Sequence, residues 1–248
     1  MAVTRSRVRV TRSTGPRKSA GLDRSRSVSL QAYEIIRQQI IANKLQPGQP
    51  LSEKELARML NVSRTPAREA LLWLAKEGLV EVFPRHGTFV SAVQVDQVFE
   101  AHTIREALEI RVVQAAAQRA TARDAHTLES NVADQSAALA CGDRTGFHRL
   151  DEEFHRALAR IARLERASRL IDEVKTPLDR VRRLANEYGR QPEDAAREHR
   201  QILEAVVTND SKAAAAAMQR HLDGSFAAIK RIIRARSDFF APVRAGRE

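Results

Sequence analysis

The stretch LDEEFH, residues 150–155, places Asp151 and His155 four residues apart. On a helix this spacing puts a carboxylate and an imidazole on one face, one turn apart, where both could bind the same metal ion. Two later histidines, His199 and His221, also lie in segments whose apolar residues recur at helical spacing. Spacing alone does not show that the four residues converge, so a metal site and a set of hydrogen-bonded core side chains both remain open.

The apolar residues around these four predict that they face inward. Asp151 and His155 fall within the apolar stripe of their own helix, which is formed by Phe147, Phe154, Leu158 and Ile161. The corresponding neighbours are Ala195, Ile202, Leu203 and Val206 for His199, and Met218, Leu222 and Ser225 for His221. Three helices therefore each direct a ligand-type side chain toward one interior. A carboxylate on a buried face is costly unless another group pairs with it.

The C-terminal part of the chain predicts helices only. Nothing from Asp96 to about Ser237 has the pattern of a strand. The candidate helices are six and lie near 96–119, 122–140, 143–162, 165–188, 192–208 and 211–236. Because short links join them, we expect an all-α antiparallel bundle. The fold class is therefore mainly α.

Residues 28–92 show another pattern, in which three short helices precede a β-hairpin. The dipeptide PG ends the first helical run, and Ser52 and Glu55 in SEKE have the spacing of a capping box that opens the second helix. After the tight connection NVS, Ser63 is a candidate N-cap of the third helix. The run LVEVFPRHGTFV then contains two β-prone segments around a turn. This order predicts a winged helix-turn-helix.

The third helix carries basic residues away from its apolar stripe. Arg64, Thr65 and Arg68 lie at its N-terminal end, off the face expected to be buried. In winged helix-turn-helix folds this end reaches base edges in the major groove, where arginine suits guanine and threonine suits a base or a phosphate. The alternative is a helix pair used only for packing, with both arginines as solvated charges. The caps, the turn and the hairpin together favour DNA binding.

Positive charge is concentrated at the N-terminus. The 248 residues carry a formal net charge of +11, and residues 1–27 hold eight Lys and Arg and one acid, which gives +7. This segment has too little apolar content to fold alone, so we expect a disordered basic arm. It is either a solubilising tail or an arm that attracts nucleic-acid phosphates, since clustered arginines release counterions from a polyanion.

Membrane and secretory signals are absent from the sequence. The longest unbroken apolar runs, among them Ala213–Met218, are far too short to span a bilayer, and the first thirty residues contain no apolar signal-peptide core. A single cysteine, Cys141, excludes an internal disulfide framework and fits a reducing cytosol. We therefore expect a cytoplasmic protein.

The segment LSEKELARMLNVSRTPAREALLWLAKEGLVEVFPRHGTFV resembles the DNA-binding domain of the GntR family of bacterial transcription regulators. The likeness covers about residues 30–91 and rests on SRTPAREAL, EGLV and HGTFV. It implies DNA contacts at Lys54, Ser63, Arg64, Thr65, Arg68, His86 and Gly87. The family often has arginine in place of Lys54. Because lysine lacks the planar fork of arginine, the resemblance supports a phosphate contact there and leaves a base contact open.

Residues 96–236 resemble the FCD ligand-binding domain of the FadR-type GntR regulators, through LDEEFH, EHRQIL and AAMQRHL. Members that bind metal use an aspartate and a histidine four residues apart plus two later histidines, which fall on Asp151, His155, His199 and His221. One carboxylate and three imidazoles suit Zn²⁺, Ni²⁺ or Mn²⁺, of which we expect Zn²⁺. The count of six helices, in place of seven, indicates the shorter, VanR-like branch.

The resemblance also implies that Arg105 points into the ligand pocket, toward a carboxylate of the effector. The alternative is a surface ion pair between Arg105 and Glu109, four residues on. Of the remaining histidines, His148 is expected at the surface, and His102 and His126 have no motif context.

The residues do not favour catalysis. HExxH, GxSxG and a phosphate loop are absent, and Glu152 and Glu153 cannot both face a metal-bound water from one helical turn. An architectural nucleic-acid-binding protein would explain the charge but not the inward aspartate and histidines. RNA-binding modules would need exposed stacking aromatics, whereas only 4% of residues are aromatic.

We therefore predict a one-component transcription regulator that is not an enzyme and acts as a homodimeric repressor on double-stranded operator DNA. A small carboxylic or hydroxy acid, bound with the metal, would control it. The alternative is a metal-dependent hydrolase or lyase fused to a DNA-binding domain. The expected parts are the arm 1–27, the winged helix-turn-helix 28–92, an effector-binding and dimerisation domain 96–237, and a tail 238–248.

Overall fold

The computed structural model describes residue 23 and residues 25–184 and 191–241. Its N-terminal elements are α1 (Val28–Ile41), α2 (Glu53–Leu60), α3 (Arg64–Lys76), β1 (Val80–Phe83) and β2 (Gly87–Val90). A linker leads to α4 (Val95–Arg119), α5 (Ala122–Ala140), α6 (Arg144–Ala162), α7 (Glu165–Val174), α8 (Thr176–Arg182), α9 (Pro192–Val207), α10 (Ser211–Ala235) and the 3₁₀ turn Ser237–Phe239. None of the described helices combines the length and apolar character needed to span a bilayer.

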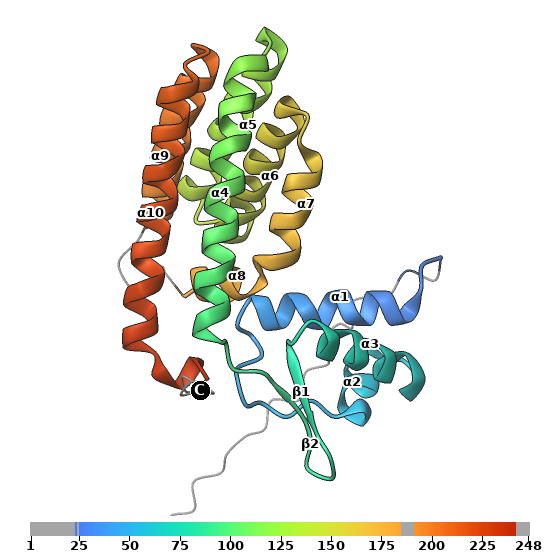
Figure 1. The fold of residues 1–248 in the computed structure, drawn as a ribbon. Coiled ribbons are helices and arrows are strands. Elements are labelled where there is room, and N and C mark those ends of the chain that lie inside the picture. The colour runs from blue at the N-terminus through green and yellow to red at the C-terminus, as the bar shows by residue number, and fades with distance from the viewer. Residues whose placement is uncertain (1–22, 24, 185–190, 242–248) are drawn as a thin grey trace, which may run out of the picture.

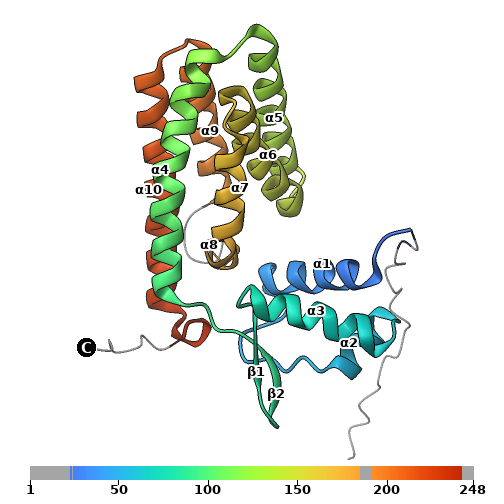
Figure 2. The ribbon, with the colours of Figure 1, turned by 45° about the vertical axis from the view of Figure 1, so that its right-hand side comes forward.

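The N-terminal unit folds around α1. Ile36 and Ile40, one turn apart on α1, are fully buried and meet Leu56 of α2 and Leu74 of α3 in one apolar cluster. In Figures 1 and 2, α1 lies across the foot of the bundle, with α2 and α3 on its far side and the β-hairpin below. The predicted three helices and hairpin are confirmed in this order.

The helix ends in this unit follow the sequence signals in part. Ser52 begins α2, because its Oγ accepts the backbone N–H of Glu55 at 3.1 Å. Ser63 holds the N-cap position of α3, but its side chain makes no capping hydrogen bond. Asn61, between the two helices, has a φ of 54°, a left-handed conformation that asparagine tolerates better than most residues. The connection is therefore tight, and Arg64 lies at the exposed start of α3.

The wing is an antiparallel hairpin. β1 and β2 pair from Val80 opposite Val90 to Phe83 opposite Gly87. Val80 and Val90 are buried in the same cluster as the three helices, whereas Phe83 is 46% exposed near the tip. Gly87 has a φ of +114°, which a residue without Cβ adopts readily. The paired ends are thus anchored and the turn projects away from the core (Figure 1).

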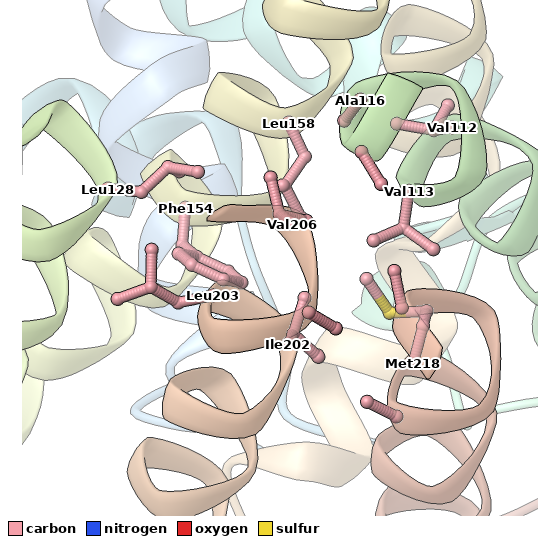
Figure 3. Close-up of a cluster of buried hydrophobic side chains, with 14 of the residues drawn as sticks. Val112, Val113, Ala116, Leu128, Phe154, Leu158, Ile202, Leu203, Val206 and Met218 are labelled. Atoms are coloured by element: carbon pink, nitrogen blue, oxygen red, sulfur yellow. The ribbon is translucent and has the colours of Figure 1, made fainter. Parts of the chain in front are cut away.

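The C-terminal domain is a bundle of long helices. α10 packs against α4 and α9, and α5 packs against α6 and α9. Figure 3 shows its core, in which Phe154 and Leu158 of α6 meet Ile202 and Val206 of α9 and Met218 of α10. The predicted all-α bundle after a winged helix-turn-helix is confirmed.

The predicted number of six helices was wrong. The segment expected as one helix over 165–188 is divided into α7 and α8 at Lys175, because Pro177 lies in the first turn of α8. Residues 185–190, at the end of the expected helix, lie outside the described residues. The described bundle therefore contains seven helices, and the count that indicated a VanR-like branch loses its basis.

The linker between the two units is paired with the C-terminal segment. The N–H of Val93 donates to the carbonyl of Phe239 at 3.1 Å, and the N–H of Ala241 donates to the carbonyl of Val93 at 3.0 Å. Phe239 and Phe240 are buried, with 0% and 8% exposure. The first residues of the expected tail 238–248 are therefore packed, because aromatic side chains there cover the foot of the bundle.

Candidate metal centre and nucleic-acid interface

Four polar side chains converge inside the helical bundle. α6 supplies Asp151 and His155, α9 supplies His199, and α10 supplies His221. Each offers one ligand atom, and these four atoms all lie within 4.8 Å of one another. Asp151, His199 and His221 have 0–1% exposure, whereas the side chain of His155 is 12% exposed. The spacing of four in LDEEFH works as predicted, because it puts both ligand-type residues of α6 on the face that meets α9 and α10.

Acceptor groups behind the histidines fix their ring orientation. The Nδ1–H of His199 donates to Gln135 Oε1 at 2.8 Å, and Gln135 is itself held by a bond from its Nε2 to Asn131 Oδ1 at 2.7 Å. Nδ1 of His221 lies 2.9 Å from Glu198 Oε2. With Nδ1 carrying the proton, the Nε2 lone pair of each ring is directed to the other side. This arrangement is the one that orients metal-binding histidines.

Asp151 has the partner that its burial requires. The Nη2 of Arg182, from α8, donates to Asp151 Oδ2 at 3.0 Å. Burial alone would raise the pKa of Asp151, but Arg182 and the neighbouring histidines hold that pKa well below its usual range. For His199 the largest effect is burial, which together with His221 lowers its pKa well below the usual range. The cluster therefore contains a carboxylate beside neutral imidazole, which is the ligand form of both groups.

The donor set fits a metal ion. Among the described residues, Asp151 Oδ1 and His199 Nε2 are buried without a hydrogen-bond partner, and they lie 3.6 Å apart. Buried polar atoms are nearly always satisfied, so two orphans facing each other call for a bound species. Ligand atoms of one tetrahedral Zn²⁺ at 2.0–2.2 Å lie about 3.3–3.6 Å apart. The four ligand atoms, which lie within 4.8 Å of one another, would therefore move together by about 1 Å at the widest pair around such an ion.

Arg105 lies at the edge of the cluster and not on the surface. It is 5% exposed, and its Nε donates to Glu109 Oε1 at 2.6 Å. Its Nη2 is 3.3 Å from His155 Nε2, while His155 Nδ1 contacts the other oxygen of Glu109. The Arg105–Glu109 pair that was the alternative to a pocket role does exist, but it is buried and lines a small cavity together with Asp151 and Arg182.

The placement of His148 differs from the expectation. It is half-buried and lines a small cavity with Asp151 and Arg182, so the predicted surface position was wrong. Burial, followed by the nearby charge of Arg182, lowers the pKa of His148 to about 4. The apolar stripe of α6 did not predict the burial of His148, because residues of α8, distant in the sequence, lie against this side of α6. His102 stacks on Phe226 with ring centroids 3.7 Å apart, a packing role.

The residues expected to contact DNA lie on the helix pair and the wing of the N-terminal unit. All of them are exposed, at the start of α3, on α2 and at the tip of the wing: Lys54, Ser63, Arg64, Thr65, Arg68, His86 and Gly87. Arg68 Nε lies 3.9 Å from Glu53 Oε1, a loose surface pair that DNA phosphates could displace. Arg85, exposed next to His86 in the wing turn, was missed by the sequence reasoning and adds a cation there.

Other missed residues are those that support the buried cluster. Arg182, Gln135 and Glu198 contact its members from three different helices. Glu109, which contacts Arg105 and His155, is the one supporting residue with a local sequence signal, since it lies one helical turn from Arg105. The burial of Asp151 predicted that a partner must exist, but no spacing rule connects residues 31 positions apart.

A winged helix-turn-helix with a basic recognition helix, joined to a helical bundle, is the architecture of a DNA-binding transcription regulator. Residues 28–90 match the family described as "Bacterial regulatory proteins, gntR family", and residues 100–224 match the FCD domain. The chain belongs to the GntR family and is a transcription regulator of the GntR/FCD type.

Known relatives agree with this assignment. The chain is 34% identical over 220 residues to the HTH-type transcriptional repressor RspR of Escherichia coli (strain K12), which covers 89% of this chain and 96% of that protein. It is 37% identical over 209 residues to an HTH-type transcriptional regulator in an unstable DNA locus of Streptomyces ambofaciens, over 84% and 88% of the two chains. The solved structure of E. coli McbR/YncC has the same fold, with a TM-score of 0.69, 23% identity, and coverage of 82% and 97%.

Proposed function

We propose that this regulator binds a divalent metal ion, Zn²⁺ above Ni²⁺ or Mn²⁺, through Asp151, His155, His199 and His221, and that a small carboxylic or hydroxy acid bound beside the metal controls its affinity for DNA. One observation carries the metal assignment. The four ligand atoms lie within 4.8 Å of one another, and Gln135 and Glu198 stand behind two of the imidazoles as the acceptors that metal-binding histidines use.

The groups beside the cluster favour an acid as the effector. Arg105 and Arg182 line the adjoining cavity, and both are arginines, whose planar fork matches a carboxylate. A metal bound there would supply a fixed positive charge for the same anion. Val112, Ala159 and Ile171 form an apolar wall that suits a short carbon chain. The cavity has about 30 Å³ of free space, about one water molecule, so the acid must be small and must shift these arginines.

The two glutamates next to Asp151, Glu152 and Glu153, do not favour the alternative of a hydrolase or lyase. Glu152 is engaged by Arg156 at 3.1 Å and by Lys175 at 3.6 Å, and Glu153 is engaged by Arg160 at 2.5 Å. Glu152 lines the cavity beside the cluster, but both carboxylates are engaged by cations, which lowers their tendency to act as a general base. The arrangement supports binding of an anion more than its turnover.

We infer that regulation is a population shift in a homodimer. Paired helix-turn-helix units read paired half-sites, so their separation must match the spacing of those half-sites. An acid that binds one arrangement of the two domains better than the other shifts the protein toward that arrangement. We propose that the acid favours the arrangement that does not fit the operator, which makes the protein a repressor released by its effector. The name of the repressor RspR supports this direction.

Metal analysis and a binding screen test this function. Purified protein is expected to hold about one Zn²⁺ per chain, and at least one acid of a panel (acetate, lactate, malate, citrate, gluconate) is expected to raise its melting temperature. The variant His199→Ala is expected to lose both the metal and the response to acids. The cluster is only a polar core if wild-type protein holds no stoichiometric metal even after loading. The same conclusion follows if His199→Ala responds to acids as strongly as wild-type protein does.

A further inference from the structure

The unsatisfied buried polar atoms of the described residues fall in two places. One is the proposed metal site, at Asp151 Oδ1 and His199 Nε2. The other is the junction of α8, the linker and the end of α1, where Arg180 Nε, Ser91 Oγ and Asn43 Oδ1 have no hydrogen-bond partner. We name this second place the α8 junction. Native proteins contain few buried polar atoms without a hydrogen-bond partner. Three of them lie at this contact between the two domains, so the hydrogen bonding of the contact is incomplete in this arrangement.

Arg180 is the main residue of the α8 junction. It is 3% exposed, and no carboxylate among the described residues forms an ion pair with it. Its Nη2 donates to the carbonyl of Ser91 in the linker at 2.9 Å, and its guanidinium lies over the ring of Phe239, 5.4 Å from the centroid. Burial lowers the pKa of Arg180 to about 10. A buried cation without a carboxylate is costly, so this residue holds the linker at the expense of stability.

α8 also reaches the metal cluster and the DNA-binding unit. Arg182, two residues after Arg180, donates to Asp151 Oδ2 at 3.0 Å. Toward the other side, Thr176 Oγ1 accepts from Arg37 Nη2 of α1 at 2.9 Å, and the carbonyl of Arg180 accepts from Asn43 Nδ2 at 2.8 Å. Figure 2 shows α8 at the foot of the bundle, on the side of α1. A helix of seven residues therefore contacts a proposed metal ligand, the linker and α1.

We propose that α8 carries the effector signal from the bundle to the DNA-binding unit, and that Arg180 is the positioning residue through which α8 holds the linker at Ser91. This proposal rests on the proposed function above. An acid beside Arg182 competes with Asp151 for its guanidinium. Because a short helix moves as one body, a change at Arg182 displaces Arg180 and its bonds to Ser91 and Asn43. Because Arg180 Nε, Ser91 Oγ and Asn43 Oδ1 have no hydrogen-bond partner in this arrangement, replacing the hydrogen bonds of the α8 junction by others costs little free energy. The junction therefore opposes a movement of α8 only weakly.

The experiment measures coupling, defined as the ratio of operator dissociation constants with and without acid. It uses Zn²⁺-loaded, full-length protein and the acid of the panel above that binds most tightly by calorimetry. Wild-type protein is expected to show a coupling of about 5–150-fold. In Arg180→Met, which keeps the aliphatic stem under Phe239, acid affinity should stay within about threefold of wild type while coupling falls to below about twofold. Arg166→Met, an exposed substitution on α7, should keep the wild-type coupling.

Two further readouts keep the result interpretable. Arg180→Met should melt no lower than wild type, since it removes an unpaired buried charge. Asn43→Gly, which preserves the left-handed backbone at a φ of 55°, removes the bond to the Arg180 carbonyl and should also reduce coupling. Full coupling in both variants would overturn the role of α8 and leave the proposed function standing. A wild-type protein that binds acid without any change in operator affinity would overturn both proposals.

Discussion

The side chain of Gln135 offers a sharp test of the metal site, because it touches no ligand atom directly. It is fully buried, and its Oε1 accepts the Nδ1–H of His199 at 2.8 Å. Gln135→Leu keeps most of the side-chain volume and removes this acceptor. Loss of such a supporting bond typically weakens metal affinity 10–100-fold, or about 1.4–2.8 kcal/mol. The protein without metal should also lose about 1–3 kcal/mol of stability, because the Nδ1–H is then buried and unsatisfied.

The assay is competition of Zn²⁺-loaded protein against a chromophoric chelator, with thermal unfolding measured in parallel. Gln201→Leu is the matched control, since Gln201 lies two residues from His199 on α9 but is exposed. It should change neither quantity. If Gln135→Leu lowers stability while Zn²⁺ affinity stays at the wild-type value, then His199 is a core residue and not a metal ligand. That result would refute the metal site while leaving the DNA-binding assignment intact.

Other predictions concern DNA and the acid. Arg64→Ala and Arg68→Ala should each cost about 1–3 kcal/mol on the operator and much less on random DNA, since base contacts discriminate between sequences; equal losses on both DNAs would make them phosphate contacts. Deleting residues 1–22 should flatten the salt dependence of DNA affinity, and an unchanged slope would reduce the arm to a solubilising tail. Arg105→Lys, which keeps a cation beside Glu109, should weaken acid binding about 10–100-fold without loss of metal; Arg111→Ala, exposed on the same helix, is the control.

The sequence predicted most of the fold because its signals are local. The PG dipeptide that ends the first helical run, the capping box of α2 and the two β-prone runs each act within a few residues, and the structure has these elements in the predicted order. The error over 165–188 has the same origin. Helical periodicity continues through the segment, but Pro177 starts a new helix and changes its direction.

The sequence predicts which face of its helix each residue of the site occupies, but not which faces of different helices meet. Periodicity placed Asp151, His155, His199 and His221 on apolar faces, and their convergence came from resemblance to a known domain. The structure brings them together because α6, α9 and α10 pack around one core. Their partners could not be predicted, because Gln135 and Arg182 come from helices whose packing depends on the whole bundle. The predicted surface position of His148 was wrong for the same reason, because α8 packs beside it.

The most direct test of the account is the operator affinity of Zn²⁺-loaded protein at fixed salt, measured by fluorescence anisotropy with and without the acid that binds best in the screen. The operator is first selected from a random DNA library with the purified protein. We predict that saturating acid weakens operator binding at least about fivefold, and that His199→Ala binds the operator but shows no such change. Equal operator affinity with and without a demonstrably bound acid would contradict the central claim that this cluster controls DNA binding.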